Sequence, residues 1–283
     1  MSGEILWASR EWSAESAKQK LVDMQSSKKA FFENDTFLIW DDEGFDSRHF
    51  GLKMGRLIGA WGDLADFRLL LPKFLSEVDK AGYDHFVVNL PSENPALIRL
   101  FERGGFFLTD TLSRMILTDM TIDMDYGDLE IGVIREDEVP LAQEMSKTIF
   151  SLSRYAWDPM LSPEGRASLM QEWVYNDCTT RGDLVLAARL HGEFIGYVAS
   201  FFDKERDMLI FDLLAVDPKA RGRGAGGALF IEAIKMCRDW VKVVQLNTQG
   251  SNRSAHRLYN RLGFVIDATN ITLHRHQNGV VPD

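Results

Sequence analysis

The sequence predicts a mixed α/β protein in which one α/β unit occurs twice in tandem. Residues 94–106 read NPALIRLFERGGF and residues 252–264 read NRSAHRLYNRLGF, and six positions are identical without a gap. At the same offset of 158 residues, Asn89 corresponds to Asn247. Self-similarity over so long a period indicates duplication of one structural unit.

The two copies contain the same predicted elements in the same order. An apolar helix at residues 67–81 leads into a strand at 84–90 in the first copy, and 224–239 leads into 241–247 in the second. The helices quoted above come next, and each ends in Gly-Phe. Glycine is suited to the end of a helix, and an aromatic residue is suited to the start of a strand.

The acidic, turn-like segment DMDYGD at 123–128 separates the copies. It predicts a first domain of residues 1–122 and a second domain of residues 129–283. At 283 residues the chain is long enough for both to have a sizeable core.

The second copy has the clearer pattern. LEIGVI at 129–134 reads as a strand, 136–150 as a helix, and Ser162 as the N-cap of a helix with proline at its first position. LVLAARL and FIGYVASFF flank the turn HGE and predict a hairpin, and MLIFDLLAV at 208–216 predicts a central strand. The expected order is β, α, α, β, β, β, α, β, α, β, with helices on both faces of a mixed sheet.

Composition restricts the class of protein. With 45% hydrophobic and 26% charged residues the chain resembles an ordinary globular protein, and no apolar run approaches the roughly 20 residues that span a bilayer. The start lacks a signal-peptide core, so we expect a cytoplasmic protein without a membrane partner. Cys178 and Cys237 alone cannot form a disulfide framework or a zinc site. The net charge of −10 argues against a nucleic-acid partner.

A glycine-rich loop comes after the central strand, in DPKARGRGAGGALF at 217–230. Backbone N–H groups at a strand-to-helix junction can bind an anion together with the helix dipole, and two arginines add charge-assisted donors. The alternatives are an ordinary turn and a dinucleotide fingerprint, Gly222-x-Gly224-x-x-Gly227. The fingerprint requires an acidic residue near the end of the next strand, and VKVVQLNTQ contains none.

Read instead as Arg221-x-x-Gly224-x-Gly226 after VDP, the loop resembles the acyl-CoA-binding motif of the GCN5-related N-acetyltransferase superfamily. Asn252, the helix with Tyr259, and Gly263-Phe264 resemble the second signature of that family. The resemblance implies that the loop amides hold the pyrophosphate of acyl-CoA. The cofactor-binding residues that it implies are Leu214, Val216, Arg221, Gly222, Arg223, Gly224, Ala225, Gly226, Asn247 and Asn252.

Shorter matches resemble sugar-nucleotide N-acyltransferases of the TDP-fucosamine acetyltransferase type. They are DSRHFG at 46–51, SRYAWDP at 153–159, Trp173 with Asn176, GYV at 196–198 and TQ at 248–249. They imply transfer of an acetyl or 3-hydroxybutanoyl group from CoA to a dTDP-linked amino-dideoxyhexose, of the 3- or 4-amino-dideoxygalactose type, for surface polysaccharide such as O-antigen. The implied acceptor-binding residues are Arg48, Phe50, Ser153, Arg154, Tyr155, Trp157, Thr248 and Gln249.

Direct acyl transfer needs no nucleophilic cysteine and no metal, and we expect neither. The resemblance makes Tyr259 the general acid for the departing thiolate, although a stripe with Ala255 and Leu258 also explains an aromatic residue there by packing. Asp212 is the candidate general base, since burial can raise its pKa. It could instead pair with a polar group of a neighbouring strand, and a water chain could then accept the proton.

The first copy lacks this set of residues. Residues 63–68, DLADFR, stand where the second copy has RGRGAG, and two carboxylates there would repel pyrophosphate. We therefore expect a degenerate N-terminal domain. Two other functions stay open, namely acylation of another small amine and non-catalytic CoA binding. The oligomeric state is also open, with a homodimer as the arrangement considered.

Overall fold

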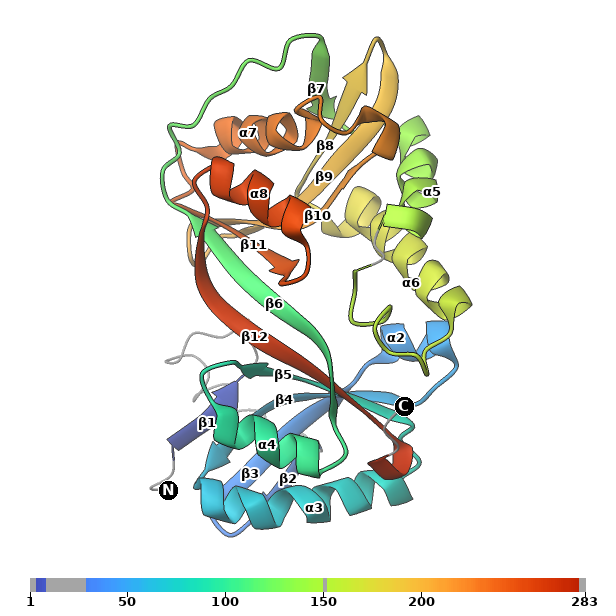
Figure 1. Ribbon diagram of the computed structural model, residues 1–283, viewed down its shortest axis with the longest axis vertical. Coiled ribbons are helices and arrows are strands. Elements are labelled where there is room, and N and C mark those ends of the chain that lie inside the picture. The colour runs from blue at the N-terminus through green and yellow to red at the C-terminus, as the bar shows by residue number, and fades with distance from the viewer. Residues whose placement is uncertain (1–3, 9–28, 150–151, 280–283) are drawn as a thin grey trace. The chain divides into compact units, whose positions relative to one another are not determined.

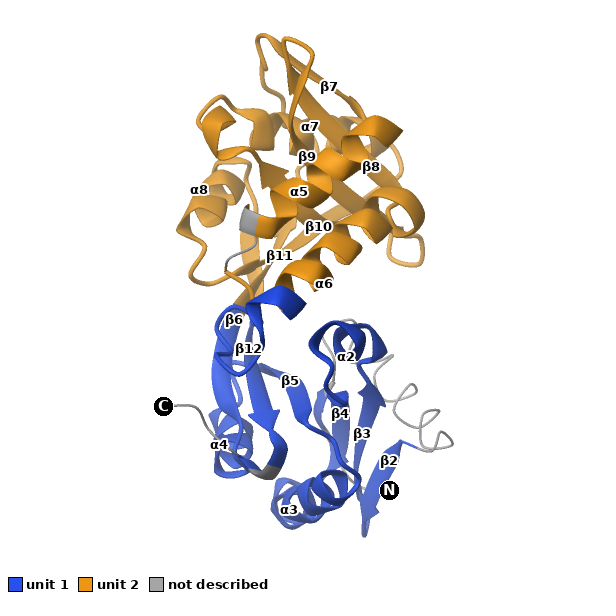
Figure 2. Cartoon of the chain, turned by 90° about the vertical axis from the view of Figure 1, so that its right-hand side faces the viewer, with its two compact units in different colours: residues 1–111, 154–165, 269–283 blue, residues 112–153, 166–268 orange. Residues whose placement is uncertain are grey.

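A computed structural model describes residues 4–8, 29–149 and 152–279 of the chain (Figure 1). They group into two compact units (Figure 2). Unit 1 takes the described residues within 1–111, 154–165 and 269–283, and unit 2 takes those within 112–153 and 166–268. The units therefore do not follow the linear division into 1–122 and 129–283. Residues 154–165 and the C-terminal segment pack with the N-terminal part of the chain.

Unit 1 has a sheet in the order β2-β3-β4-β5-β12, with β1 also paired to β4. Its strands are β1 (Glu4–Ala8), β2 (Ala30–Glu33), β3 (Thr36–Asp42), β4 (Met54–Gly62), β5 (His85–Pro91) and the end of β12 (Val265–His276). Its helices are α2 (Gly44–Phe50), α3 (Leu64–Lys80) and α4 (Pro95–Arg103).

Helix α3 shows why the first copy folds. Phe67, Leu70, Leu71, Phe74, Leu75 and Val78 are all buried and recur with the helical period, so they form one apolar face. Asp63 caps the helix, since its carboxylate accepts a hydrogen bond of 2.6 Å from the Ala65 amide. Asn94 caps α4 in the same way through the Leu97 amide.

Unit 2 has a sheet in the order β6-β11-β10-β9-β8-β7. Its strands are the end of β6 (Phe107–Leu117), β7 (Leu129–Val133), β8 (Leu184–Leu190), β9 (Glu193–Asp203), β10 (Met208–Val216) and β11 (Val243–Gln249). Its helices are α5 (Val139–Ile149), α6 (Pro163–Asn176), which begins in unit 1, α7 (Ala225–Cys237) and α8 (Arg253–Arg261). Helices α5 and α7 lie on opposite faces of this sheet (Figure 1).

The order of elements predicted from residue 129 onward is confirmed. The elements follow one another as expected, in the order β7, α5, α6, β8, β9, β10, α7, β11, α8 and β12. The hydroxyl of Ser162 accepts a hydrogen bond of 3.1 Å from the Gly165 amide, which confirms the predicted N-cap of α6. No described helix is long and apolar enough to cross a membrane.

Both units contain a parallel strand pair that separates after four residues. In unit 2, β10 pairs with β11 from Met208–Val243 to Phe211–Leu246 and no further. In unit 1, β4 pairs with β5 from Met54–His85 to Leu57–Val88. At the same point, each of these strands has a bulge in its antiparallel pairing on the other side. Asp212 is the extra residue of β10 opposite β9, and Ile58 is the extra residue of β4 opposite β3.

Within the described part of the chain, only unit 1 has a further strand where its parallel pair separates. There β1 pairs antiparallel with β4 from Gly59 to Gly62, directly after the β4–β5 pairing ends. Trp7 of β1 is buried, and its ring packs edge-on against Phe67 at 5.4 Å and Phe101 at 5.3 Å. The gap after Phe211 in unit 2 has no such strand among the described residues.

Candidate active site

A cleft of about 620 Å³ opens in unit 2 where β10 and β11 separate. Residues of β10, the loop before α7, α7, β11 and α8 line it. Every residue predicted to be catalytic or cofactor-binding lines the cleft except Arg223, which is exposed on the same loop. Sequence positions far apart are thus brought to one place by the separation of two parallel strands.

The glycine loop begins the cleft-lining helix α7. Gly222 and Gly224 have φ values of 81° and 86°, a backbone region that glycine adopts without strain. A Cβ atom on Gly226 would lie 3.1 Å from Leu258, so glycine there lets α7 approach α8. The amides of the first turn of α7 have no partner within the helix, and Arg221 is exposed beside them. This arrangement suits a bound anion.

Asn247 provides an unsatisfied acceptor inside the cleft. Its Oδ1 atom is buried and has no hydrogen-bond partner among the described residues. The corresponding residue of unit 1, Asn89, accepts a hydrogen bond of 2.9 Å from the Thr272 hydroxyl. A buried acceptor without a partner costs free energy, so a ligand N–H group would stabilise Asn247. Asn252 lines the cleft too, and it caps α8 by accepting from the Ala255 amide.

Tyr259 lies in α8 with its ring in the core of unit 2. The ring packs edge-on against Phe230 at 5.4 Å and at 5.9 Å from Phe264, which accounts for the aromatic residue by packing. The side chain is 7% exposed, and burial raises the pKa of its hydroxyl. No hydrogen bond joins that hydroxyl to another residue of the described chain. Tyr259 therefore offers a neutral, unengaged proton donor at the cleft.

Asp212 is the extra residue of the β10 bulge and also lines the cleft. Its Oδ2 atom accepts a hydrogen bond of 2.9 Å from Trp173 Nε1 in α6. The expected alternative, a polar partner on a neighbouring strand, is thus replaced by a partner from a helix. This single bond leaves the carboxylate with further acceptor capacity.

Asp177 stands behind Asp212 and was missed by sequence reasoning. Burial and the Asp212 charge raise the pKa of Asp177 to about 8, and its exposed fraction is 0%. Arg181 Nη1 lies 3.1 Å from its Oδ1 atom, without the geometry of a hydrogen bond. Asp177 begins a short π-helical turn, Asp177–Arg181, a feature frequent at functional sites. No sequence motif marks it.

The predicted acceptor-binding residues fall into both units. Ser153, Thr248 and Gln249 line the cleft of unit 2. The hydroxyl of Ser153 is buried without a hydrogen-bond partner among the described residues. The others, Arg48, Phe50, Arg154, Tyr155 and Trp157, belong to unit 1.

Arg154 and Tyr155 are engaged within unit 1. Arg154 Nη2 lies 2.9 Å from Asp46 Oδ2, and the Tyr155 hydroxyl donates to the same atom at 2.8 Å. Phe50 stacks on the Tyr155 ring at 5.6 Å. A phosphate on Arg154 would therefore compete with a carboxylate that is already bound. Arg48 and Trp157 are exposed.

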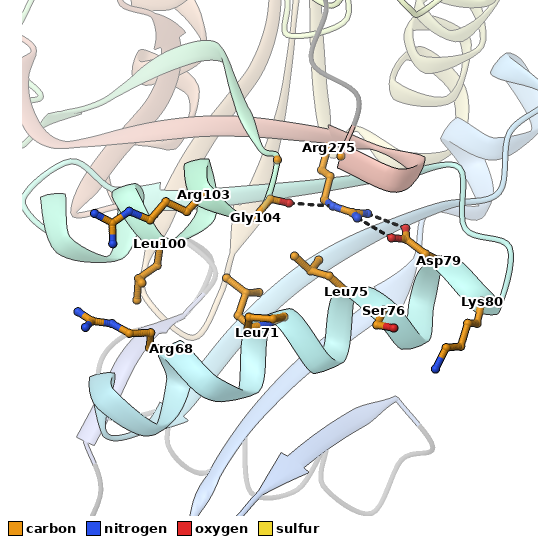
Figure 3. Close-up of a pocket in the computed structure, with 13 residues that line it drawn as sticks. Arg68, Leu71, Leu75, Ser76, Asp79, Lys80, Leu100, Arg103, Gly104 and Arg275 are labelled. Carbon is orange, nitrogen blue, oxygen red and sulfur yellow. Dashed lines mark hydrogen bonds and ion pairs between the residues drawn. The ribbon is translucent and has the colours of Figure 1, made fainter.

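Unit 1 has a larger hollow, of about 890 Å³, between α3 and α4 (Figure 3). Arg275 crosses it, with Nη2 2.6 Å from Asp79 Oδ2 and Nε donating to the Gly104 carbonyl at 3.0 Å. Leu71, Leu75 and Leu100 also line it. The hollow contains no equivalent of Asp212 or Tyr259 among its described lining residues, so the candidate active site is the cleft of unit 2.

Part of the chain is similar to known acetyltransferases. The acetyltransferase (GNAT) family model matches residues 149–264. The chain is 24% identical over 233 residues to the spore coat polysaccharide biosynthesis protein SpsD of Bacillus subtilis, covering 81% of this chain and 80% of that protein. It is 28% identical over 188 residues to mycothiol acetyltransferase of Kineococcus radiotolerans, covering 63% and 58%.

Solved structures agree on the fold. A GCN5-related N-acetyltransferase from Sphaerobacter thermophilus has a TM-score of 0.60 at 14% identity and covers 96% of this chain and 88% of its own. A tandem GNAT protein from the clavulanic acid biosynthesis pathway has a TM-score of 0.57 at 12% identity, with 100% and 99% covered. The fold is thus that of GNAT structures, and residues 149–264 match the acetyltransferase (GNAT) family model.

Proposed function

We propose that unit 2 transfers an acyl group from acyl-CoA to the amino group of a nucleotide-linked amino sugar. The observation that carries the proposal is the separation of β10 from β11, which opens onto the glycine loop, Asn247, Asp212 and Tyr259 together. These groups match the separate needs of the reaction, which are an anion site, a slot for an extended amide chain, a proton acceptor and a proton donor.

The donor binds along β10. The amides of the glycine loop and of the first turn of α7 hold the pyrophosphate, aided by Arg221 and Arg223. The pantetheine arm enters the gap, where the backbone of Leu214 and Val216 no longer pairs with β11. Asn247 Oδ1 accepts a hydrogen bond from one of its amides. The acyl group is acetyl or 3-hydroxybutanoyl.

The reaction is a direct transfer. The neutral amine attacks the thioester carbonyl, the C–N bond forms, and the C–S bond breaks as the CoA thiolate departs. Asp212, backed by the buried Asp177, takes the proton of the amine, and Tyr259 gives its proton to the thiolate. Because both proton-transfer groups lie at one cleft, each step has a group on this chain to perform it.

The proposed acceptor is a dTDP-linked amino-dideoxyhexose with a 3- or 4-amino group, used for surface polysaccharide. Similarity to SpsD, a protein of spore coat polysaccharide biosynthesis, supports a sugar acceptor. Ser153, Thr248 and Gln249 supply polar groups for its hydroxyls at the cleft. The proposed location is the cytoplasm, a reducing compartment in which the two cysteines would stay as free thiols.

Unit 1 is proposed to be a degenerate copy that binds no CoA. Strand β1 pairs with Gly59–Gly62, the stretch that corresponds to the pantetheine edge of β10. Asp63 places a carboxylate at the start of α3, where a pyrophosphate would need free amides. Ile58 and Phe101 replace Asp212 and Tyr259.

A mass-spectrometric transfer assay tests the function. The purified chain is incubated with acetyl-CoA or 3-hydroxybutanoyl-CoA and a panel of amines, comprising dTDP-3-amino and dTDP-4-amino sugars, a UDP-amino sugar, a free amino sugar and a simple alkylamine. We expect an acylated dTDP sugar, at a rate that the free sugar does not reach. Faster turnover of the nucleotide-free amines would support the alternative, acylation of another small amine. CoA binding without acylation of any amine would overturn the proposal in favour of a non-catalytic CoA-binding protein.

A further inference from the structure

Three histidines and one aspartate gather in the interior of unit 1. We call them the histidine–aspartate cluster. None is more than 5% exposed, and its members are His85, Asp158, His274 and His276.

The sheet of unit 1 brings the histidines together. His85 of β5 lies directly opposite His276 of β12, and His274 lies two residues away on the same strand. Side chains two residues apart on a strand share one face of the sheet. The ring centroids of His85 and His274 are 4.5 Å apart, and those of His85 and His276 are 5.0 Å apart. The three imidazoles therefore face one another across two strands.

Asp158 lies in the middle of the cluster and comes from the segment before α6. Its Oδ2 atom is 2.7 Å from His274 Nδ1 and 2.9 Å from His276 Nε2. His85 Nε2 is 3.6 Å from the same oxygen, too far for a hydrogen bond. One atom each from His85, Asp158 and His274 lie within 4.8 Å of one another.

The hydrogen bonds within the cluster leave His85 unsatisfied. Both ring nitrogens of His85 are buried without a hydrogen-bond partner in the described chain, and so is Nε2 of His274. Burial of a polar nitrogen without a partner is costly, so native proteins rarely keep one without a reason. Asp158 bonds to His274 and His276, but it does not come within hydrogen-bond distance of His85. A cation bound by His85, Asp158 and His274 would give His85 Nε2 a partner.

We propose that the histidine–aspartate cluster binds one zinc ion in unit 1. Imidazole nitrogens and a carboxylate oxygen are donors that zinc favours, and His85, Asp158 and His274 each offer one. Ligand atoms of a tetrahedral zinc ion lie about 3.3 Å apart, given bonds of roughly 2.0–2.1 Å. Asp158 Oδ2 lies 2.7 Å from His274 Nδ1 and 3.6 Å from His85 Nε2, and both separations are within about 0.6 Å of that spacing.

The ion would tie three distant segments of the chain to one another. Asp158 and His274 are 116 residues apart in the sequence, and His85 belongs to a third segment. Arg154 and Tyr155 precede Asp158 on the segment that the ion fixes, so it also sets the position of their ion pair with Asp46. The sequence predicted no metal, because only His274 and His276 are near neighbours along the chain. Unit 1 thus acquires a role in the protein that does not depend on CoA.

Metal binding by the full chain tests this proposal. The chain, purified without a histidine tag and stripped with a chelator, is titrated with Zn²⁺ and, separately, with Co²⁺. We expect one ion per chain by elemental analysis, and a visible Co²⁺ spectrum with the intensity of a four-coordinate N/O site. Zn²⁺ should also raise the Tm. Asp158→Asn and His85→Gln should each weaken binding by a factor of about ten or more.

His191→Asn serves as the matched control, since His191 is an exposed histidine of the β8–β9 turn in unit 2. It should bind zinc as the unaltered chain does. If the unaltered chain binds no zinc, or its Co²⁺ spectrum is that of six-coordinate aqueous ion, the proposal is overturned without reference to any variant. Equal zinc affinity in His85→Gln, Asp158→Asn and the control would likewise mean an adventitious ion only.

Discussion

Trp173 Nε1 donates a hydrogen bond of 2.9 Å to Asp212 Oδ2, and this bond fixes the carboxylate at the bulge of β10. Trp173 belongs to α6, and Asp177 comes directly after the end of the same helix. One helix therefore both orients the proposed base and places a second carboxyl behind it. Burial and the charge of Asp212 raise the pKa of Asp177 to about 8, so Asp177 is mostly protonated at neutral pH.

The rate of acyl transfer should rise with pH through an apparent pKa near 8. Burial and the Asp212 charge raise the pKa of Asp177 to about 8, so below that pH Asp177 is neutral and adds no negative charge beside Asp212 to favour proton uptake from the amine. The measurement is kcat/KM from pH 6 to 9.5. Asp177→Asn should move the midpoint, whereas ionisation of the amine alone would leave it in place. An identical profile for the variant would contradict a role for the pair.

Asp177→Asn should also stabilise the fold at alkaline pH. The folded chain holds the Asp177 proton more tightly than the unfolded chain, so this contribution to stability is complete below about pH 3.8 and is lost as pH rises through about 8. The variant has no such ionisation. The difference in unfolding free energy, variant minus native sequence, should therefore grow between pH 5 and 9 in urea titrations. A constant difference would show that Asp177 does not titrate in this range.

Removal of the Tyr259 hydroxyl should reduce turnover and little else. Tyr259→Phe keeps the ring contacts with Phe230 and Phe264, so we expect an unchanged Tm. kcat should fall at least about ten-fold, since general acid catalysis contributes typically 10²–10⁴. Tyr126→Phe is the control, because it removes a hydroxyl that bonds to Glu232 on the outer side of α7. Equal kcat in both variants would contradict the assignment of Tyr259 as the general acid.

Alanine variants of two glycines with the same backbone conformation distinguish the effect of backbone strain from the effect on ligand binding. Gly222 and Gly192 both have φ of 81°, and a Cβ atom added to either would lie in open space. Alanine at either should cost roughly 1 kcal/mol of stability, through the left-handed backbone alone. Only Gly222→Ala should raise KM for acyl-CoA, because Gly192 lies in the β8–β9 turn. If both variants leave KM unchanged, the loop does not hold the donor.

Calorimetric titration with CoA should give one site per chain. Strand β1 fills the gap of unit 1, and Trp7 anchors it against Phe67 and Phe101. Trp7→Ala should lower the stability of the fold by about 3–5 kcal/mol, as expected for a buried tryptophan. Two CoA sites in the native chain would contradict the assignment of unit 1 as a degenerate copy.

Local sequence patterns predicted the order of the elements, but they did not predict which segments of the chain pack together in each unit. The order of elements from residue 129 onward results from hydrophobic periodicity, caps and turn residues, which act over a few positions. Which residues belong to each unit does not follow from such local patterns, because residues 154–165 and the end of β12 pack with the N-terminal part of the chain. Nothing local in a sequence encodes that choice.

The residues of the candidate site also fall into those that local motifs predict and those that depend on long-range contacts. The glycine loop and the Tyr259 helix are contiguous motifs, so a resemblance could find them. Asp177, the β1 strand in unit 1 and the histidine–aspartate cluster depend on contacts between residues distant in sequence. Arg154 was predicted as a phosphate ligand, and its arginine type alone could not reveal the buried pair with Asp46.

A crystal structure of the chain with CoA and a dTDP-amino sugar tests the central claim most directly. We expect the pyrophosphate on the amides of the glycine loop, the pantetheine arm between β10 and β11, and the CoA sulfur within hydrogen-bonding reach of the Tyr259 hydroxyl. The sugar amine should lie on the side of Asp212. CoA bound anywhere else, or with its sulfur remote from both Tyr259 and Asp212, would contradict the account.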